Sequence, residues 1–211
     1  MQNIGFAYAI LPGLKKLYST APSVPAGKYL GFFNTHPYLA PTVAGVFLKL
    51  EEQGDDGTVE KLKPAISGSL AALGDTFFWA TLKPIVGLLL LLTVLADQVW
   101  GMILVLLFYN SLHLWVMSWG FTMGYRNGPG GALELGRFLS VDRTRHIALM
   151  IPLLAGMVLA GLSPGIPGAG WGIGPGLLIF FVAAFAFRLR LGVLWIFYGV
   201  FTLSLIWTII K

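Results

Sequence analysis

Residues 70–85 read LAALGDTFFWATLKPI and lead into the most apolar part of the chain. Fourteen Leu, Ile, Val and Phe residues between positions 70 and 95 favour insertion into a membrane by about 4–8 kcal/mol in total. Asp75 and Lys83 would each cost roughly 2.5–3.5 kcal/mol at mid-membrane, so the balance is near zero. Lys83 also precedes Pro84, a position that disfavours helical geometry. The stretch therefore predicts a broken or re-entrant helical segment that protein shields from lipid.

The composition is that of a membrane protein. Of 211 residues, 56% are hydrophobic and 11% are charged, whereas soluble domains carry about 25% charged residues. Long apolar stretches, several of which approach the ~20 residues that a helix needs to cross the hydrocarbon core, lie at 84–96, 99–119, 147–162, 171–187 and 191–210. We predict an all-α integral membrane protein with several transmembrane helices and with broken or re-entrant helical segments in its N-terminal half. Residues 1–211 are expected to form a single membrane domain.

The basic residues predict how the chain crosses the membrane. The net charge is +5, but the basic side chains are scattered in short loops and are not clustered with aromatics, which argues against a nucleic-acid partner. Basic loops tend to stay on the cytoplasmic side. The basic loops of this chain hold Lys61 and Lys63, residues 126–145, and Arg188 and Arg190. Asp97–Gln98 and the uncharged loop 163–176 would then lie outside, and a last crossing at 191–210 puts the C-terminus outside as well.

Other segments are expected to lie partly outside the lipid. Residues 4–18 predict a short helix broken at Pro12, and 32–50 is too interrupted by polar residues and prolines for an ordinary span. The segment 51–63 reads as a hydrophilic connection, and 123–145 as a polar loop around an Asn-Gly-Pro-Gly-Gly turn. We expect no cleavable secretory signal, because no basic leader opens the chain. The absence of cysteine excludes disulfide and thiolate chemistry.

Gly74-Asp75-Thr76 has two interpretations. In the first, Asp75 caps a helix by accepting hydrogen bonds from free backbone amides, and Gly74 permits a tight approach. In the second, the four-residue spacing of Asp75, Trp79 and Lys83 places them along one stripe of a helix. A carboxylate that accepts hydroxyl hydrogens beside an aromatic face suits a sugar. Both interpretations stay open.

The stretch FFNTHP at 32–37 repeats this pattern of aromatics followed by polar groups. It fits a helix start, with Asn34 or Thr35 as the cap and Pro37 in the first turn. It also fits an amide and a hydroxyl at a backbone break that are available to a polar solute, as in transporters whose broken helices bind substrate. The candidate substrate-binding residues are Asn34, Thr35, Asp75, Thr76, Trp79 and Lys83.

The residue types that support metal or covalent chemistry are not arranged for it. His36, His113 and His146 lack metal-ligand spacing, and His113 fits a satisfied interior residue. The acidic stretch EEQGDD at 51–56 fits a solvated turn. No nucleophilic triad or phosphate-binding glycine loop is present. We therefore predict no catalytic residue, metal site or cofactor.

Four stretches of this chain resemble a known family. They are MQNIGFAYAILPGLKKLY (1–18), FFNTHPYLAPTVAGVFLKLEEQ (32–53), GSLAALGDTFFWATLKPI (68–85) and GFTMGYRNG (120–128), with a looser similarity at 174–193. The chain resembles the IID membrane component of the mannose-family (mannose/fructose/sorbose) bacterial phosphoenolpyruvate-dependent sugar phosphotransferase system. It departs from the family pattern in beginning directly at MQN and in its compact link from 129 to 146.

The resemblance implies a subunit that pairs with a IIC membrane subunit in the bacterial inner membrane. A hexose-type sugar would pass through the joint core and receive phosphate from a histidine of the cytoplasmic IIB subunit, which IIA recharges. The IID chain itself would not be phosphorylated. Trimers of IIC–IID pairs are expected, with residues 1–96 in a mobile core and 97–211 in a scaffold.

Two other functions are alternatives to sugar translocation. A regulatory or vestigial IID-like subunit would keep the fold and the pairing but would not transport. A membrane enzyme is disfavoured because no catalytic constellation stands in the sequence.

Overall fold

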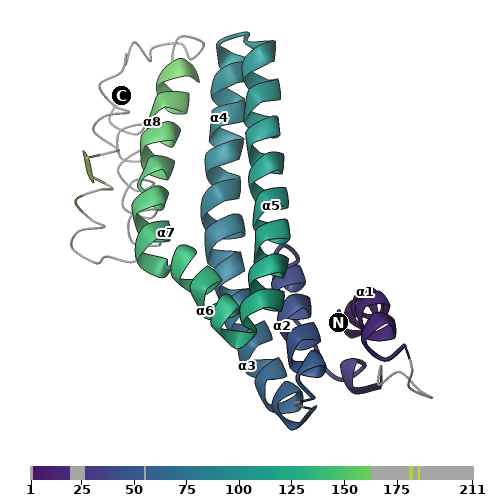
Figure 1. Cartoon of the computed structure of the whole chain (residues 1–211). Helices are drawn as coiled ribbons and strands as arrows, with labels where there is room; N and C mark the ends of the chain where they lie inside the picture. The colour runs from purple at the N-terminus through teal and green to yellow at the C-terminus, as the bar shows by residue number, and fades with distance from the viewer. Residues whose placement is uncertain (1, 20–26, 55, 163–180, 183–184, 186–211) are drawn as a thin grey trace. The chain divides into compact units, whose positions relative to one another are not determined.

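The computed structural model describes residues 2–19, 27–54, 56–162, 181–182 and 185. This part of the chain is helical and contains no strand, so the predicted all-α class is confirmed for it. Figure 1 labels the helices and colours them along the chain. The chain divides into two compact units. The first unit combines residues 1–82 with 107–145, and the second combines 83–106 with 146–211. Each unit is described separately.

Helix α1 (Asn3–Leu17) opens the first unit and is continuous through Pro12. Phe6, Ile10 and Leu14 recur every four residues and are buried, so one face of the helix packs into the unit. Pro12 removes one backbone hydrogen bond, and the packing of this face holds the helix together across it. The predicted break at Pro12 is therefore wrong. The short 3-10 helix η1 (Gly27–Tyr29) follows.

Helix α2 (Ala40–Glu52) begins later than the sequence suggested, with Pro41 in its first turn. Proline is favoured there because the first amides of a helix have no intrahelical partner. Asn34 and Thr35 lie well before this start and Pro37 lies in the preceding turn, so the capping interpretation of FFNTHP is wrong. With 13 residues, α2 is shorter than the ~20 residues of a full span.

Three helical elements then follow without an intervening loop: α3 (Asp56–Gly74), the π-helix η2 (Asp75–Leu82) and α4 (Lys83–Leu95). The expectation that Lys83 leaves helical geometry before Pro84 is wrong, because α4 begins at Lys83. The irregularity takes the form of a π-helix instead of a break. Proline clashes with the carbonyl four residues earlier in a regular helix, and the wider turns of η2 end just before Pro84. The side-chain hydroxyl of Thr81 donates to the backbone carbonyl of Thr76, five residues back, at 2.9 Å.

Helices α5 (Val99–Asn127), α6 (Pro129–Phe138) and α7 (Val141–Ala148) occupy the next stretch. The expected polar loop at 123–145 is therefore mostly helical, and the turn is confined to Gly128, whose φ of 56° favours glycine. Among the described residues, two helices are long and apolar enough to cross a membrane, namely Gly57–Leu95 and Val99–Asn127. The second of these confirms that the apolar run 99–119 forms one helix of sufficient length.

Glycines bring α2 and the later part of α5 together within the first unit. A Cβ at Gly45 of α2 would overlap the backbone carbonyl of Phe121, and one at Gly124 of α5 would overlap the carbonyl of Thr42. A Cβ at Gly120 would overlap the Thr42 hydroxyl. Small residues spaced in this way allow membrane helices to pack backbone against backbone.

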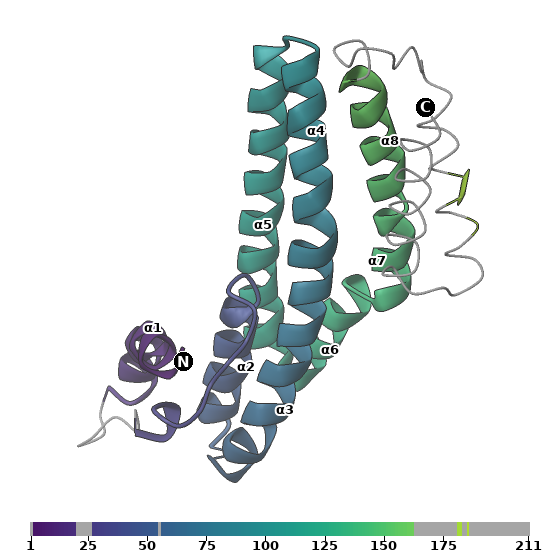
Figure 2. The same cartoon turned by 180° about the vertical axis from the view of Figure 1, so that it is seen from behind.

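The second unit contains α4, the first residues of α5 up to 106, and α8 (Met150–Leu162). The turn between α4 and α5 contains Asp97, whose φ is 53°. The backbone amide of Gln98 donates a hydrogen bond to the Thr93 carbonyl at 2.8 Å. Helix α8 packs along α4, where Gly161 lies against Leu95 (Figure 2). The spans expected at 171–187 and 191–210, and the outer loop 163–176, lie outside the described residues apart from 181–182 and 185.

Candidate functional site

The two motif segments singled out in the sequence meet at His36 and Gly74. The His36 side chain is 1% exposed, and a Cβ at Gly74 would overlap its Cβ. The tight approach expected at Gly74 is therefore present, and His36 makes it. The imidazole lies 5.1 Å from the ring of Phe78 and 5.0 Å from that of Trp79, centroid to centroid. Segment 32–37 thus packs on the junction between α3 and η2.

An aromatic layer continues from His36 toward α5. The Tyr38 ring lies 5.0 Å from Phe78 and stacks on His113 at 4.5 Å. The hydroxyls of Tyr38 and Tyr109 are 3.1 Å apart, and His113 Nδ1 is 3.1 Å from the Tyr109 carbonyl oxygen. His113 is half-buried and is held by a ring and a carbonyl, so its polar group is satisfied as predicted, but the residue is not fully interior. Nothing in the spacing of these residues along the sequence pointed to this layer.

Exposure along the π-helix and the first turn of α4 alternates in pairs. Residues 75, 76, 79, 80 and 83 are exposed, whereas 77, 78, 81, 82, 85 and 86 are buried. The stripe expected from the four-residue spacing is therefore an exposed face. Asp75 and Trp79 lie on it in the first unit, and Lys83 opens α4 in the second unit. Trp79 keeps 47% of its surface exposed while its ring contacts His36 edge-on.

Asp75 does not cap a helix. It follows Gly74 of α3 directly, and the backbone is helical on both sides of it. No free amides of a helix start are therefore available to its carboxylate. The capping interpretation is wrong, and the exposed carboxylate needs another explanation.

The remaining predicted site residues differ in how their polar groups are used. Asn34 is exposed. The Thr35 amide donates to Gln2 Oε1 at 3.1 Å, while its hydroxyl is buried and has no hydrogen-bond partner among the described residues. The Thr76 hydroxyl donates to the Ala72 carbonyl at 2.8 Å, which leaves its oxygen able to accept.

A second polar cluster, which we call the Glu51 network, lies at the end of α2. The Glu51 carboxylate accepts hydrogen bonds from Tyr29 and, at 2.6 Å, from Tyr18, and pairs with Lys28 Nζ at 2.6 Å. Its side chain is completely buried. Lys63 of α3 donates to the Lys28 carbonyl at 3.1 Å. The network ties α1, η1, α2 and α3 together, so the reading of 51–56 as a solvated turn is wrong for Glu51.

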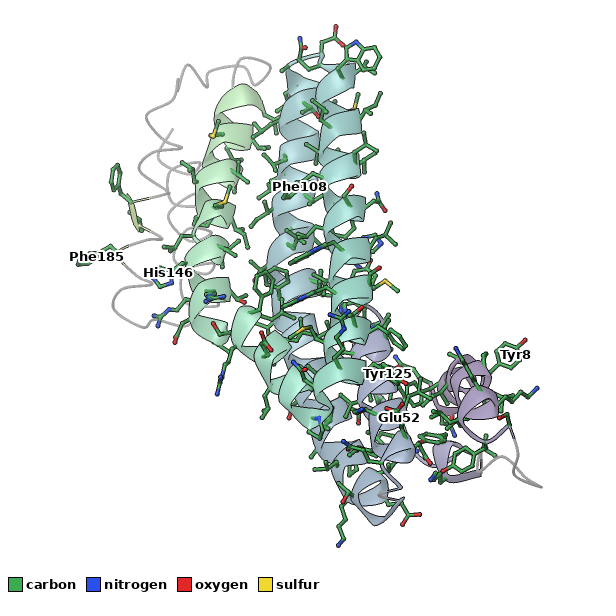
Figure 3. All side chains as sticks on the ribbon, viewed as in Figure 1. Tyr8, Glu52, Phe108, Tyr125, His146 and Phe185 are labelled. Atoms are coloured by element: carbon green, nitrogen blue, oxygen red, sulfur yellow. The ribbon has the colours of Figure 1, made fainter. Side chains whose placement is uncertain are left out.

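The neighbouring Glu52 has different partners. It pairs with Lys49 at 2.8 Å, and the Tyr125 hydroxyl donates to it at 3.1 Å (Figure 3). These two hydrogen bonds, the one from Lys49 first, lower the pKa of Glu52 below its ordinary value. The hydrogen bond to Glu52 raises the pKa of Lys49. Both side chains are partly exposed, so this pair adds little stability.

The described helices indicate the class of protein, and the comparison with known families then indicates the family. Among the described residues, two apolar helices are long enough to span a membrane, which fits the class of helical membrane proteins. The sequence profile of the PTS system mannose/fructose/sorbose family IID component matches residues 1–167. The chain belongs to this family and is a membrane component of a sugar phosphotransferase system.

Individual relatives agree with the family. The chain is 28% identical to the PTS system mannose-specific EIID component of Escherichia coli K12, covering 97% of this chain and 84% of the relative. It is 28% identical to the fructose permease IID component of Bacillus subtilis, covering 77% of this chain and 60% of the relative. The first alignment is 247 positions long, more than the 211 residues of the chain, so the relative has additional residues within the aligned region.

A solved structure shares the fold. It is the cryo-EM structure of the mannose transporter ManYZ in complex with microcin E492. The match has a TM-score of 0.56 and 23% identity, and it covers 97% of this chain and 86% of that chain.

Proposed function

We propose that the chain is a sugar-translocating subunit that pairs with a IIC membrane subunit and moves a hexose-type sugar inward. Phosphorylation of the sugar by IIB, recharged by IIA, would accompany its passage, and the IID chain itself would carry no phosphate. Membership of the IID family supports this proposal, as do relatives named for mannose, sorbose and fructose.

The observation that carries the proposal is the contact between segment 32–37 and the start of η2. It places Asn34 and Asp75, both exposed, on segments that His36 and Gly74 hold together. Sugars are recognised by carboxylate and amide groups beside an aromatic face, and Trp79 supplies such a face. π-Helical turns occur frequently at functional sites, which favours η2 as one wall of the site.

The proposed substrate-binding set keeps the residues predicted from the sequence: Asn34, Thr35, Asp75, Thr76, Trp79 and Lys83. The Asp75 carboxylate would accept hydrogen bonds from sugar hydroxyls, the Asn34 amide would both accept and donate them, and Trp79 would stack on the sugar ring. The buried Thr35 hydroxyl lies next to Asn34 and has hydrogen-bonding capacity to spare. Lys83 is exposed and is assigned to the set from its place on the four-residue stripe.

The wider arrangement is proposed on sequence grounds. It comprises the bacterial inner membrane, a C-terminus outside the cell, a trimer of IIC–IID pairs, a re-entrant path for part of the N-terminal half, and a core of residues 1–96 with a scaffold of 97–211. The basic loops and the family membership support it.

Uptake by a reconstituted system tests the function. A bacterial strain without its own mannose-family system would express IIA, IIB and IIC with this chain or without it. Phosphoenolpyruvate-dependent uptake of labelled mannose, fructose and sorbose is then measured. We expect uptake of at least one sugar only when the chain is present.

The same experiment separates the alternative. A regulatory or vestigial subunit would co-purify with IIC, yet uptake would be equal with and without it. That result, in cells where the complex is shown to assemble, would overturn the transport proposal.

A further inference from the structure

A groove of about 620 Å³ runs between α3 and α6, wholly within the first unit. Ile66, Leu70 and Leu73 line it from α3, and Ala132 and Leu133 line it from α6. Its volume lies within the usual range of ligand sites, ~300–1,000 Å³. The walls are apolar, so the groove suits hydrocarbon.

One cationic side chain stands among the lining residues that the structure describes, and it is Arg137. It is exposed, and no carboxylate of the described residues forms an ion pair with it. Ser140 also lines the groove near it in sequence. The groove therefore combines an apolar bed with a guanidinium, the group best suited to bind a phosphate through two parallel hydrogen bonds.

Aromatic residues indicate the depth of this guanidinium in the membrane. Trp115 and Trp119 of α5 stack at 5.3 Å, and both rings contact Phe138, the neighbour of Arg137, at 5.7 and 5.4 Å. Tryptophans gather at the level of the lipid headgroups. Arg137 would thus lie where a lipid phosphate lies, and the apolar part of the groove would receive the acyl chains.

We propose that the groove between α3 and α6 binds an anionic phospholipid, with its phosphate on Arg137 and its acyl chains along Leu70 and Leu133. Basic pockets between membrane helices on the cytoplasmic side bind lipids of this type. The surrounding basic segment, 126–145, is the one that the distribution of charges assigns to the cytoplasmic side. The lipid would act as a fixed part of the α3–α6 interface, separate from the sugar site.

The test measures which lipids stay bound to the purified complex of the full chain with its IIC partner. Native mass spectrometry after equilibration with equal amounts of phosphatidylglycerol and phosphatidylethanolamine gives the retained fraction of each. Phosphatidylethanolamine carries the same phosphate together with an ammonium group that the guanidinium repels, so we expect a preference for phosphatidylglycerol. Loss of the positive charge in Arg137→Gln should lower this preference on the order of tenfold. Arg137→Lys should keep most of the preference, because the positive charge remains.

Two further variants fix the location. Arg126→Gln removes another exposed arginine, one that does not line the groove, and should leave retention unchanged. Ala65→Trp fills the groove from α3 and should reduce retention of both lipids.

Two results would overturn the proposal. One is equal retention of phosphatidylglycerol in the parent, Arg137→Gln and Ala65→Trp complexes. The other is loss of the IIC subunit from Ala65→Trp with unchanged lipid content, which would assign the groove to a helix of the partner. If the Ala65→Trp chain does not fold, the comparison of Arg137→Gln with Arg137→Lys decides, since both changes are on the surface. Sugar uptake is measured separately, so failure here leaves the transport proposal standing.

Discussion

The first unit holds two polar regions that differ in how their groups are used. In the Glu51 network the carboxylate is fully buried and is occupied by two tyrosine hydroxyls and a lysine. On the face that contains Asp75 the carboxylate is exposed, follows a helix without capping one, and has a half-exposed tryptophan one turn away. Both regions are rare polar interruptions in an apolar chain.

The difference separates polarity that holds a fold from polarity that is available to a ligand. A buried charge that is paired and hydrogen-bonded to several elements favours one arrangement of those elements. An exposed carboxylate on a helical backbone adds nothing to the fold and retains its hydrogen-bonding capacity. Changes in the first region should alter stability, and changes in the second should alter sugar binding.

The largest effect is expected for Glu51→Gln. Removing one partner of a buried ion pair costs about 3–5 kcal/mol, because the remaining charge stays uncompensated. The variant should lower the melting temperature of the purified complex strongly and increase its cleavage by protease. The matched control is Glu52→Gln, one residue away and partly exposed, which should change stability little.

A double variant tests the cause of that loss. Lys28→Met combined with Glu51→Gln removes both charges and should recover part of the stability. If the double variant is less stable than Glu51→Gln alone, the network is held by its hydrogen bonds and not by charge compensation.

Asp75→Asn should differ from Glu51→Gln in leaving the stability of the complex unchanged and weakening sugar binding. The structure leaves no capping role to lose, so stability should stay as it is. If the Asp75 carboxylate accepts hydrogen bonds from sugar hydroxyls, its replacement by an amide removes charge-assisted hydrogen bonds. Sugar binding should then weaken by roughly 1.5–3 kcal/mol, or about ten- to a hundredfold. Calorimetric titration of sugar into the assembled complex measures this.

Two variants accompany that titration. Glu60→Gln changes another exposed residue, at the other end of the same helical stretch, and should leave sugar affinity unchanged. Trp79→Phe should cost less than Asp75→Asn because a ring remains to stack. Full affinity in the Asp75→Asn complex would remove this carboxylate from the proposed site.

Gly74→Ala should affect both the stability of the complex and its sugar binding. The added methyl group would overlap His36, and overpacking of this kind typically costs 1–3 kcal/mol. We expect a moderate loss of stability together with weaker sugar binding, because segment 32–37 would be pushed away from η2. Gly68→Ala, where nothing lies within 4 Å, is the control. Equal results for the two variants would mean that the close approach of His36 is unimportant.

The smallest effect concerns pH and the exposed pair at the end of α2. The pKa of Glu52 is lowered in the folded chain, so its contribution is present above the unfolded pKa of about 4.3 and is lost as the pH falls through the folded value. The pKa of Lys49 is raised, so its contribution is present below about 10.4 and is lost as the pH rises through the folded value. The small stability difference between the parent and Glu52→Gln should therefore vanish at acidic pH. A difference that persists unchanged at pH 3 would mean that the carboxylate charge does not cause it.

Apolar runs predicted the helices better than they predicted what the polar residues do. The helices at 83–95, 99–127 and 150–162 follow from continuous apolar sequence. The π-helix was missed because Pro84 signals an irregularity but not its form. The contact of His36 with Gly74 joins residues far apart in the chain, and no local pattern reports such a pairing.

The two adjacent glutamates show where the sequence stops being informative. Glu51 and Glu52 stand in one hydrophilic stretch, yet one is buried and the other is partly exposed. Their environments depend on tyrosines and lysines from α1, η1 and α5, which composition cannot place. One tertiary contact did have a local signal, since Gly120 and Gly124 carry the small-residue spacing of closely packed membrane helices.

The glycine contact between α2 and the later part of α5 restricts how these helices can move. Backbone faces backbone there, and the carbonyls of Thr42 and Phe121 occupy the space that a Cβ would take at Gly124 and Gly45. Sliding α2 along α5 by a turn would bring Pro41 or Lys49 into the place of Gly45, where no room exists for a side chain. The two helices therefore cannot slide along each other by a turn without first separating. During any transport cycle, α2 and the later part of α5 should therefore move together as one rigid body, and any bending should occur elsewhere in the chain.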